Sequence, residues 1–570
     1  MKRRSSWAMA LLALVLAACS PGGAATSGSV SGPAPAAAPQ KTLVYVSRGE
    51  PPTLAVRPLV GFSGSLNPQL RLFNAMLDYL AEDETTHPYL AESLPQLNTD
   101  TWRVSPDGTM ATTYKLRPNL TWHDGTAFSA DDFVFGWQVY SKPELGISGS
   151  LPFNVMQEAT APDARTLVVR WKQPYPDAAS MDTLFQALPR HILEGPLHDL
   201  DQVAFTSLPF WSSEYVGMGA YKVDRWEPGA FIEGSAFDGF ALGRAKIERL
   251  KVAFISDPNT ALANLLSGEA QFIADFVLGY DEGQALEHEW AARSGGTVYY
   301  APVLLRVTQI QLRPDYVKPQ ALLDVRVRRA VAQSFDTPGV IDGLTGGRGL
   351  LTYTMSSPRA PYYPVIERAI TKNEYDPRAS ARLFEEAGLA RAADGFYRSA
   401  SGEPFQLDVW TTGGSFSQEN RVWVDGLRRN GIEATPQTLG PALLADAQAR
   451  ALTPGMFTAG AGAAAERYRD LSIKSIPKAD NRWTGNNRGG WESPDYERFY
   501  QAYNTALDRD NRIQQLAQME KTVSADVGSI PHYFTLVITA FSSDLVGPAM
   551  RQTPDAANGQ SNVFTWEWKN

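Results

Sequence analysis

The sequence predicts an α/β protein with more than one lobe. Two observations support this class. Short runs rich in β-branched residues alternate with segments of helical periodicity, and many of these helices have identifiable capping residues. The chain has 570 residues, of which 44% are hydrophobic and 20% are charged, so it is long enough for two or more lobes. In such an alternating pattern, helices are expected to cover the faces of sheets.

The chain begins with a segment typical of exported proteins. Residues 1–18 join a basic end to an apolar run that is too short to span a bilayer, which predicts a signal peptide. The residues LAAC at positions 16–19 match the bacterial lipobox, in which the cysteine sulfur receives a diacylglycerol. An ordinary secretory cleavage site beside an incidental cysteine is the alternative. Because Cys19 is the only cysteine, an intramolecular disulfide and a thiolate metal cluster are excluded.

Residues 19–40 predict a lipidated cysteine followed by a disordered tether. The tether has no charged residue and almost no bulky apolar one, so it cannot bury enough surface to fold. Loss of the signal peptide removes three basic residues and changes the formal net charge from −9 to −12. An acidic body argues against nucleic acid as a partner and against adsorption to anionic lipid. We therefore expect a body held by lipid at the extracytoplasmic face of a bacterial membrane.

The folded part begins with a strand and continues with capped helices. Residues 41–47 read KTLVYVS and have the length and β-branched content of a strand. Further along, Asp257 caps a helix that has Pro258 in its first turn and ends at Gly268. The residues that follow, AQFIADF at 270–276, predict a strand.

The second half of the chain uses the same signals. Asp376 and Pro377 open a helix that Gly388 ends. Residues 417–430 predict another helix, which Gly431 ends before a short strand that reads IEA. No internal repeat or coiled-coil heptad pattern interrupts this alternation, which predicts sheets covered by helices.

The stretch YKLRPNLTWHDGTAFSADDFVFGW, residues 114–137, gathers a histidine, three aspartates and two tryptophans. These residue types are suited to acid–base chemistry or metal binding, but each polar residue also has a structural explanation. An alternating strand is followed by an Asp-Gly turn, and Ser129 then caps a helix with Asp132 three residues further on. We therefore interpret His123, Asp124, Asp131 and Asp132 as architecture.

The same stretch resembles the signature of the solute-binding proteins of the dipeptide, oligopeptide and nickel class, which are the extracellular receptors of ABC importers. The resemblance continues in order along the chain. GMGAYKVDRWEPGAFIEGSAFDGF, at 217–240, is similar to the family's glycine-rich strand and hairpin, with Ala220 where the family usually has proline. The other similar stretches are DPNTALANLLSGEAQF, LLDVRVRRAVAQSFDTPGVI, YDPRASARLFEEAGL, RRNGIEA and MEKTVSADVGSIPHYF.

The resemblance implies a two-lobed periplasmic-binding-protein fold of type II, cluster C, with an extra subdomain in lobe one. Two crossovers, which we place near residues 278 and 528, join lobes that close around a ligand. The implied organisation is lobe one at 41–278 and 529–570, an inserted subdomain at about 87–215, and lobe two at 279–528. The resemblance also implies a monomer that delivers a peptide or other small solute to an ABC permease, with no cofactor and no enzymatic activity.

One departure from the family pattern concerns the ligand. Peptide-binding members usually have a Gly-Trp-x-x-Asp-Tyr segment after a late strand of lobe two, and its aspartate holds the ligand's α-ammonium. Here the strand that ends at Gly460 runs into AGAAAERYRD, with alanines in place of that aspartate. Glu466 or Asp470 substitutes for it only if the loop is shifted. Ordinary free-amine peptides are therefore in doubt, and a sugar, an opine-like compound or a metal chelate is the alternative.

The candidate ligand-binding residues lie in loops that follow predicted strands. Aromatic residues are candidates for stacking, an arginine for a ligand carboxylate, and asparagines for hydrogen bonds. Asn487, beside two of these candidates, belongs to the same stretch NRWTGNN. The set is Glu50, Phe62, Arg348, Trp410, Phe416, Gly460, Trp483 and Asn486.

A secreted hydrolase is the alternative from another class of function. The sequence contains no Gly-x-Ser-x-Gly elbow, no His-Glu-x-x-His motif and no phosphate-binding loop. Its six histidines include no close helical pair, so no metal site is predicted. A binding protein that signals or assists folding without feeding a transporter is a further alternative.

Overall fold

The computed structural model describes residues 41–56, 59, 70–81, 85–145, 149–274, 276–413, 415–462, 464–550 and 560–569. The predicted signal peptide, the lipidation site Cys19, the tether and the candidate Phe62 lie outside these residues. Within them, no helix has the length and apolar character needed to cross a membrane.

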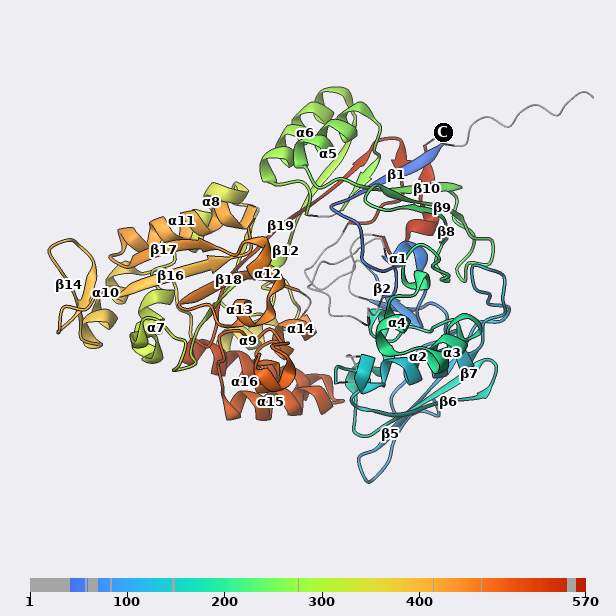
Figure 1. Ribbon diagram of the computed structural model, residues 1–570, viewed down its shortest axis with the longest axis horizontal. Helices are drawn as coiled ribbons and strands as arrows, with labels where there is room; N and C mark the ends of the chain where they lie inside the picture. Colours follow the sequence, from blue (N-terminus) through green and yellow to red (C-terminus); the bar gives the residue numbers. More distant parts are fainter. Residues whose placement is uncertain are drawn as a thin grey trace, which may run out of the picture. The chain divides into compact units, whose positions relative to one another are not determined.

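One large sheet runs through the centre of the fold (Figure 1). Its strand order is β17-β16-β18-β12-β19-β11-β1-β10-β9-β8, and β13 pairs with β19 beside this path. The central strands are β12 (Gly296–Ile310) and β19 (Ile530–Ser542), which pair in antiparallel fashion along most of their length. Two register shifts, one of them between Pro302 and Leu304, interrupt this pairing.

The part of the sheet next to β19 contains the strands of the first lobe. They are β1 (Thr42–Ser47), β8 (Tyr221–Glu227), β9 (Phe231–Ala236), β10 (Arg249–Phe254) and β11 (Phe272–Ile273). Helices α5 (Pro258–Ser267) and α6 (Tyr280–Arg293) pack against this part through a core that includes Val46, Ile273 and Leu286. The C-terminal segment returns here, since the rings of Trp566 and Phe272 lie 4.6 Å apart.

A separate four-stranded sheet occupies the region of the predicted inserted subdomain. Its order is β4 (Trp102–Val104), β5 (Met110–Lys115), β7 (Thr166–Trp171) and β6 (Met156–Asp163). The helices of this region are α2 (Ala130–Tyr140), α3 (Arg190–Asp199) and α4 (Gln202–Thr206). Shorter elements nearby are α1 (Leu70–Phe73), β2 (Asp78–Leu80) and β3 (Thr86–Pro88).

The second lobe surrounds the other end of the large sheet. Its strands are β13 (Leu350–Leu351), β16 (Gln406–Thr411), β17 (Glu433–Thr438) and β18 (Met456–Ala461). The helices that follow β12 are α7 (Val325–Ala332), α8 (Thr337–Thr345), α9 (Tyr363–Ala369), α10 (Pro377–Glu386), α11 (Ser415–Arg429), α12 (Pro441–Ala445), α13 (Ala447–Ala451), α14 (Ala464–Arg469), α15 (Pro494–Thr505) and α16 (Arg509–Asp526). Two small ribbons complete the chain, β14 (Leu389–Arg391) with β15 (Tyr397–Ser399) and β20 (Leu545–Val546) with β21 (Glu567–Trp568).

Helices cover both faces of this part of the sheet. One core contains residues of α7, α8, α10 and α11 together with Val409, Met456 and Tyr533 of the strands. The other contains residues of α9, α15 and α16 together with Leu305 and Phe534. Tyr533 and Phe534 are neighbours in β19 and enter different cores, as the alternation of side chains along a strand requires.

The predicted capping signals are confirmed. Asp257 accepts a hydrogen bond from the backbone N–H of Thr260, and Gly268 ends α5 with a φ of 81°. The predicted strand at 270–276 is shorter than expected, because only Phe272 and Ile273 pair with β1 and β19.

The stretch at residues 114–137 is architectural, as predicted. Ser129 and Asp132 form a reciprocal capping box at the start of α2. His123 accepts the Gly217 N–H at its Nδ1 and lies 3.1 Å from the Gly219 carbonyl through its Nε2. Burial lowers the pKa of His123 to about 4. The histidine is therefore neutral at neutral pH and joins the turn to the chain before β8.

Candidate functional site

The strongest candidate site lies where three parallel strands of the second lobe end. Strand β16 pairs in parallel with both β17 and β18, so their carboxyl ends meet at one edge of the sheet. Helix α11 begins at Ser415, four residues after β16 ends, which places its N-terminus at the same edge. Ligands of open α/β sheets bind outside the carboxyl ends of the strands. We call Arg306, Phe416, Glu419, Gly460 and Tyr533 the carboxyl-edge site.

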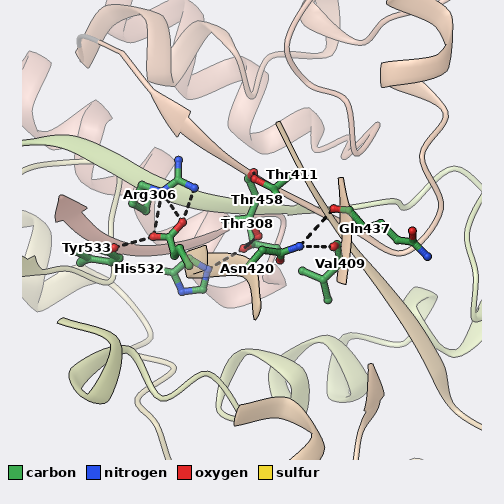
Figure 2. Close-up of polar contacts among 10 residues, drawn as sticks. Arg306, Thr308, Val409, Thr411, Asn420, Gln437, Thr458, His532 and Tyr533 are labelled. Atoms are coloured by element: carbon green, nitrogen blue, oxygen red, sulfur yellow. Dashed lines mark hydrogen bonds and ion pairs between the residues drawn. The ribbon is translucent and has the colours of Figure 1, made fainter. Parts of the chain in front are cut away.

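A buried ion pair forms the centre of the carboxyl-edge site (Figure 2). The Nε of Arg306 donates to both carboxylate oxygens of Glu419, at 3.1 and 2.9 Å, and its Nη2 donates to the second oxygen as well. The Arg306 side chain is 0% exposed and that of Glu419 is 5% exposed. The Tyr533 hydroxyl donates to Glu419 at 2.6 Å. Burial of charged groups is tolerated when they are paired in this way.

Two of the residues predicted from the sequence lie directly beside this pair. The guanidinium carbon of Arg306 lies 3.9 Å from the centroid of the Phe416 ring, in the first turn of α11. Gly460 is directly opposite Arg306 in the register of β18 and β12. Directly opposed residues share a face of the sheet, so Gly460, Arg306 and Phe416 lie together.

Neutral polar groups continue from the ion pair into the sheet. His532 Nε2 lies 2.7 Å from the Thr308 hydroxyl, which in turn lies 2.8 Å from that of Thr458. Burial, assisted by the charge of Arg306, lowers the pKa of His532 to about 3. Burial and the neighbouring Glu419 raise the pKa of Tyr533. At neutral pH the network therefore carries charge only on Arg306 and Glu419.

Helix α11 is fastened to the strand ends by a buried asparagine. Asn420 donates through its Nδ2 to the carbonyls of Val409 in β16 and Gln437 in β17, at 2.7 and 3.3 Å (Figure 2). Together with the Arg306–Glu419 pair, these bonds hold the first turns of α11 over the sheet. The positions of Phe416 and Glu419 are thereby fixed relative to β12 and β18.

Arg306 keeps one donor group without a partner. Its Nη1 is buried and makes no hydrogen bond to any group of the described residues. Figure 2 shows a terminal nitrogen of Arg306 that points away from the hydrogen-bonded carboxylate. A guanidinium is a planar fork of donors that matches carboxylate and phosphate oxygens.

The aromatic candidate Trp410 lies on the opposite face of the sheet from Phe416. Its partner in the register of β18 is Phe457, whereas Val409, on the α11 face, is opposite Met456. The Trp410 Nε1 is buried and has no hydrogen-bond partner among the described residues. The structure therefore does not bring Trp410 and Phe416 together as two walls of one site.

Two other candidates contact residues outside the carboxyl-edge site. Both carboxylate oxygens of Glu50 are used, one by Trp226 Nε1 at 2.6 Å and the other by the Gly229 N–H at 2.8 Å. The guanidinium carbon of Arg348 lies 4.1 Å from the centroid of the Tyr300 ring, and its Nη2 lies 3.7 Å from Glu287 of α6. Arg348 is therefore next to the connecting strand β12 and away from the carboxyl-edge site.

The remaining candidates lie in the loop after residue 481. Trp483 has a φ of 60°, which is rare for a residue with a bulky side chain. Asn486 donates to Asp470 at 3.1 Å, and its carbonyl accepts from Gln309 of β12 at 2.8 Å. Asn487 is buried and holds the loop through backbone carbonyls, among them that of Trp491. The side chain of Glu466 lies outside the described residues.

The sequence interpretation missed Arg306, Glu419 and Tyr533. A signal for Arg306 was present, because it interrupts the run VLLRVTQI, whose other members suit a buried strand. An arginine is almost never fully buried without a partner. The partner was hidden, because Glu419 lies 113 residues further along in a helix with several polar residues.

The described residues hold no group of three or more histidine, cysteine or acidic side chains arranged to bind a metal ion. At the carboxyl-edge site, the guanidinium and the aromatic ring are groups that bind ligands by hydrogen bonds and stacking.

Comparisons with known proteins agree with this architecture. The model of the family described as "Bacterial extracellular solute-binding proteins, family 5 Middle" matches residues 88–468. The oligopeptide-binding protein AppA of Bacillus subtilis (strain 168) is 26% identical over 455 residues, which cover 77% of each chain. The dipeptide-binding protein of Escherichia coli (strain K12) is 24% identical over 395 residues, or 65% of each chain.

Solved structures share the fold. NikZ from Campylobacter jejuni, in complex with Ni(L-His), superposes with a TM-score of 0.76 at 19% identity, covering 93% of this chain and 100% of NikZ. An oligopeptide-binding protein from Thermus thermophilus, complexed with a pentapeptide, also gives a TM-score of 0.76, at 20% identity, and covers 92% of this chain and 96% of its own. The chain therefore shares the fold of these binding proteins, in agreement with the two-lobed α/β fold predicted from the sequence.

Proposed function

The chain belongs to the bacterial extracellular solute-binding proteins of family 5, and from this premise we propose that it is a lipid-anchored receptor for a peptide-like solute. The receptor captures the solute between two closing lobes and delivers it to an ABC permease. The observation that carries the proposal is the family match over residues 88–468. The carboxyl-edge site supplies one wall of the binding site, with Phe416 and Gly460 as its ligand-facing residues.

Lobe closure needs a hinge, and packing supports a hinge inside β12 and β19. Helix α6 packs with Val46 and Ile273 of the first-lobe strands, which favours a lobe boundary after this helix. The register shift between Pro302 and Leu304 weakens the pairing of the two connecting strands at one point. We therefore propose a bending point beside Pro302, further along the chain than the crossover predicted near residue 278, while the crossover near residue 528 stays a prediction.

A peptide-like ligand is favoured by the named ligands of similar proteins, which include oligopeptides and dipeptides. The departure at residues 461–465 argues against recognition of a free α-ammonium by the usual aspartate. A peptide bound through its carboxyl end or backbone fits both observations. Sugars, opine-like compounds and metal chelates are alternative outcomes of the binding test.

The binding test uses the mature protein without its signal peptide. Ligand retained during purification is released by denaturation and identified by mass spectrometry. A panel of peptides, sugars, opines and nickel–histidine is then screened by thermal shift. A ligand at 100 times its Kd should stabilise the protein by about 2.7 kcal/mol. Turnover of a substrate, with no ligand that shifts the unfolding temperature, would contradict the receptor function.

Lipid anchoring is tested separately in the full chain. Cys19→Ala should move the protein from the membrane fraction to the soluble extracytoplasmic fraction, and the acyl mass should disappear from the N-terminal peptide. Retention of Cys19→Ala in the membrane would show that another feature holds the protein there.

A further inference from the structure

We propose that Arg306 is an anion subsite, and that the unpaired N–H groups of its Nη1 hold a carboxylate of the solute captured at the carboxyl-edge site. This inference rests on the proposed receptor function and further specifies that the ligand carries a negative charge. Three observations carry it: an unused donor on a buried guanidinium, the position of that guanidinium at the start of α11, and the glycine opposite it.

The unused donor is the first observation. The Nε and Nη2 of Arg306 donate to Glu419, whereas its buried Nη1 has no partner among the described residues. A buried donor that has lost water and gained no acceptor destabilises the folded protein. An acceptor that arrives with a ligand removes this cost, so the binding energy of an anion is enlarged at this position.

A second buried arginine shows that this fold can provide acceptors for the terminal nitrogens of a buried guanidinium. Arg328 in α7 is 5% exposed and pairs with Asp526 at 2.7 Å. Its Nη1 donates to the carbonyls of Leu322 and Leu323, and its Nε donates to the Asp526 carbonyl. Arg306 has the same chemistry and the same kind of carboxylate partner, yet it retains an unpaired donor. Arg512 also leaves its Nε unpaired, but both of its terminal nitrogens are paired with Asp177. The contrast therefore concerns the terminal nitrogen Nη1, which is paired in Arg328 and Arg512 and unpaired in Arg306.

The start of α11 is the second observation. The first backbone N–H groups of a helix have no partner inside the helix, and they carry partial positive charge. Helix α11 has 15 residues, and Arg306 contacts it in its first turn, through the ring of Phe416. The unpaired Nη1 and the helix N-terminus therefore favour the same kind of ligand group, an anion.

Access to Arg306 is the third observation. Gly460, opposite Arg306 in the register, is exposed, and the side chain of Leu304 lies 3.0 Å from where a Cβ of residue 460 would stand. Phe416 is half-buried and covers one face of the guanidinium. A carboxylate that approaches over Gly460 reaches Nη1 after a rotation of the Phe416 side chain. A planar carboxylate matches the planar guanidinium, and inorganic phosphate is the comparison that the test includes.

The experiment compares wild-type protein with Arg306→Lys. Lysine keeps the positive charge for Glu419 but lacks the second fork of the guanidinium, so the ion pair is retained and the outward donor is lost. The probes are N-acetyl-trialanine, its C-terminal amide, sodium acetate, sodium succinate and sodium phosphate. Dissociation constants come from calorimetry, and the unfolding temperature is followed with each probe. Arg328→Lys is the matched control, because it makes the same change in the other buried pair.

We expect the free acid to bind wild-type protein at least tenfold more tightly than the amide, and Arg306→Lys to abolish this preference while Arg328→Lys keeps it. If Arg306→Lys does not fold, Gly460→Ala is used, because its added Cβ lies 3.0 Å from the Leu304 side chain, narrows the approach and leaves both members of the ion pair in place. Equal binding of acid and amide to wild-type protein would overturn the subsite, as would stabilisation by phosphate alone or by no probe at all. If the peptides fail to bind while acetate or succinate stabilises wild type more than Arg306→Lys, the peptide ligand is wrong and the anion subsite stands.

Discussion

His532 and Arg306 show how much one buried residue depends on its neighbours. His532 is 1% exposed, its ring lies 4.6 Å from that of Trp423, and Arg306 lies close enough to disfavour its protonation. The histidine thus accepts or donates hydrogen bonds as a neutral ring and leaves the positive charge of the site to Arg306. A second positive charge here would be repelled by Arg306.

Acid should destabilise the protein through His532. Its pKa is about 3 in the folded protein and 6.5 in an unfolded chain, so the unfolded chain takes up a proton first as the pH falls. The stability that the neutral ring contributes is complete above pH 6.5 and is lost progressively as the pH falls toward 3. At pH 5 this loss is about 2 kcal/mol, and His532→Gln should not show it.

The measurement is urea unfolding, followed by tryptophan fluorescence at pH 7.5 and pH 5. His288→Gln is the control, because the His288 side chain is 86% exposed. An equal fall in the unfolding midpoint for wild type and His532→Gln would show that the buried ring does not resist protonation.

At the scale of single elements, the sequence predicted what is encoded locally. The caps of helices such as α5 and α2 depend on residues within three or four positions of each other, so a short stretch of sequence is enough to predict them. The carboxyl-edge site was predicted only in part. Phe416 and Gly460 could be proposed from the sequence because the first follows a predicted strand and the second ends one, whereas the Arg306–Glu419 pair depends on strand order, which no local pattern contains. For the same reason the opposite faces of Trp410 and Phe416 were not foreseen.

The start of α2 should depend strongly on Asp132. Its two oxygens accept the backbone N–H groups of Ser129 and Arg190, at 3.0 and 3.1 Å, so it joins α2 to the start of α3. Asp132→Ala leaves both donors without an acceptor at a buried position. We expect a loss of about 3 kcal/mol in the free energy of unfolding, measured by urea titration. Asp131→Ala, in the same turn but exposed, should cost less than about 0.5 kcal/mol. Similar losses for the two variants would contradict the structural role of Asp132.

Across the whole molecule, contacts outside the shared sheet join the lobes. Arg512 of α16, a helix of the second-lobe core, pairs with Asp177 in the short helix η2 (Pro176–Ala179) at 2.6 and 2.7 Å. Leu507, just before α16, packs against the core of the first lobe. Ala178, next to Asp177, is buried in that same core. The ion pair is therefore anchored in both lobes, and a bidentate arginine–carboxylate geometry makes it sensitive to their relative position.

The Arg512–Asp177 pair should favour the closed form. Its side chains are 22% and 33% exposed, so screening by water is incomplete and the pair is worth about 1 kcal/mol. Arg512→Gln should open the lobes in the absence of ligand, seen as a larger radius of gyration in X-ray scattering, and weaken ligand binding by up to about tenfold.

The charge-exchanged variant Arg512→Asp with Asp177→Arg should restore part of the lost closure and ligand binding, because attraction across the lobes returns. Arg498→Gln is the matched control, since Arg498 pairs with Asp495 inside α15 and, in the described part of the chain, forms no ion pair with another element. If Arg512→Gln scatters like wild type and binds as tightly, closure does not depend on this pair, and the energy must come from the ligand's contacts to both lobes.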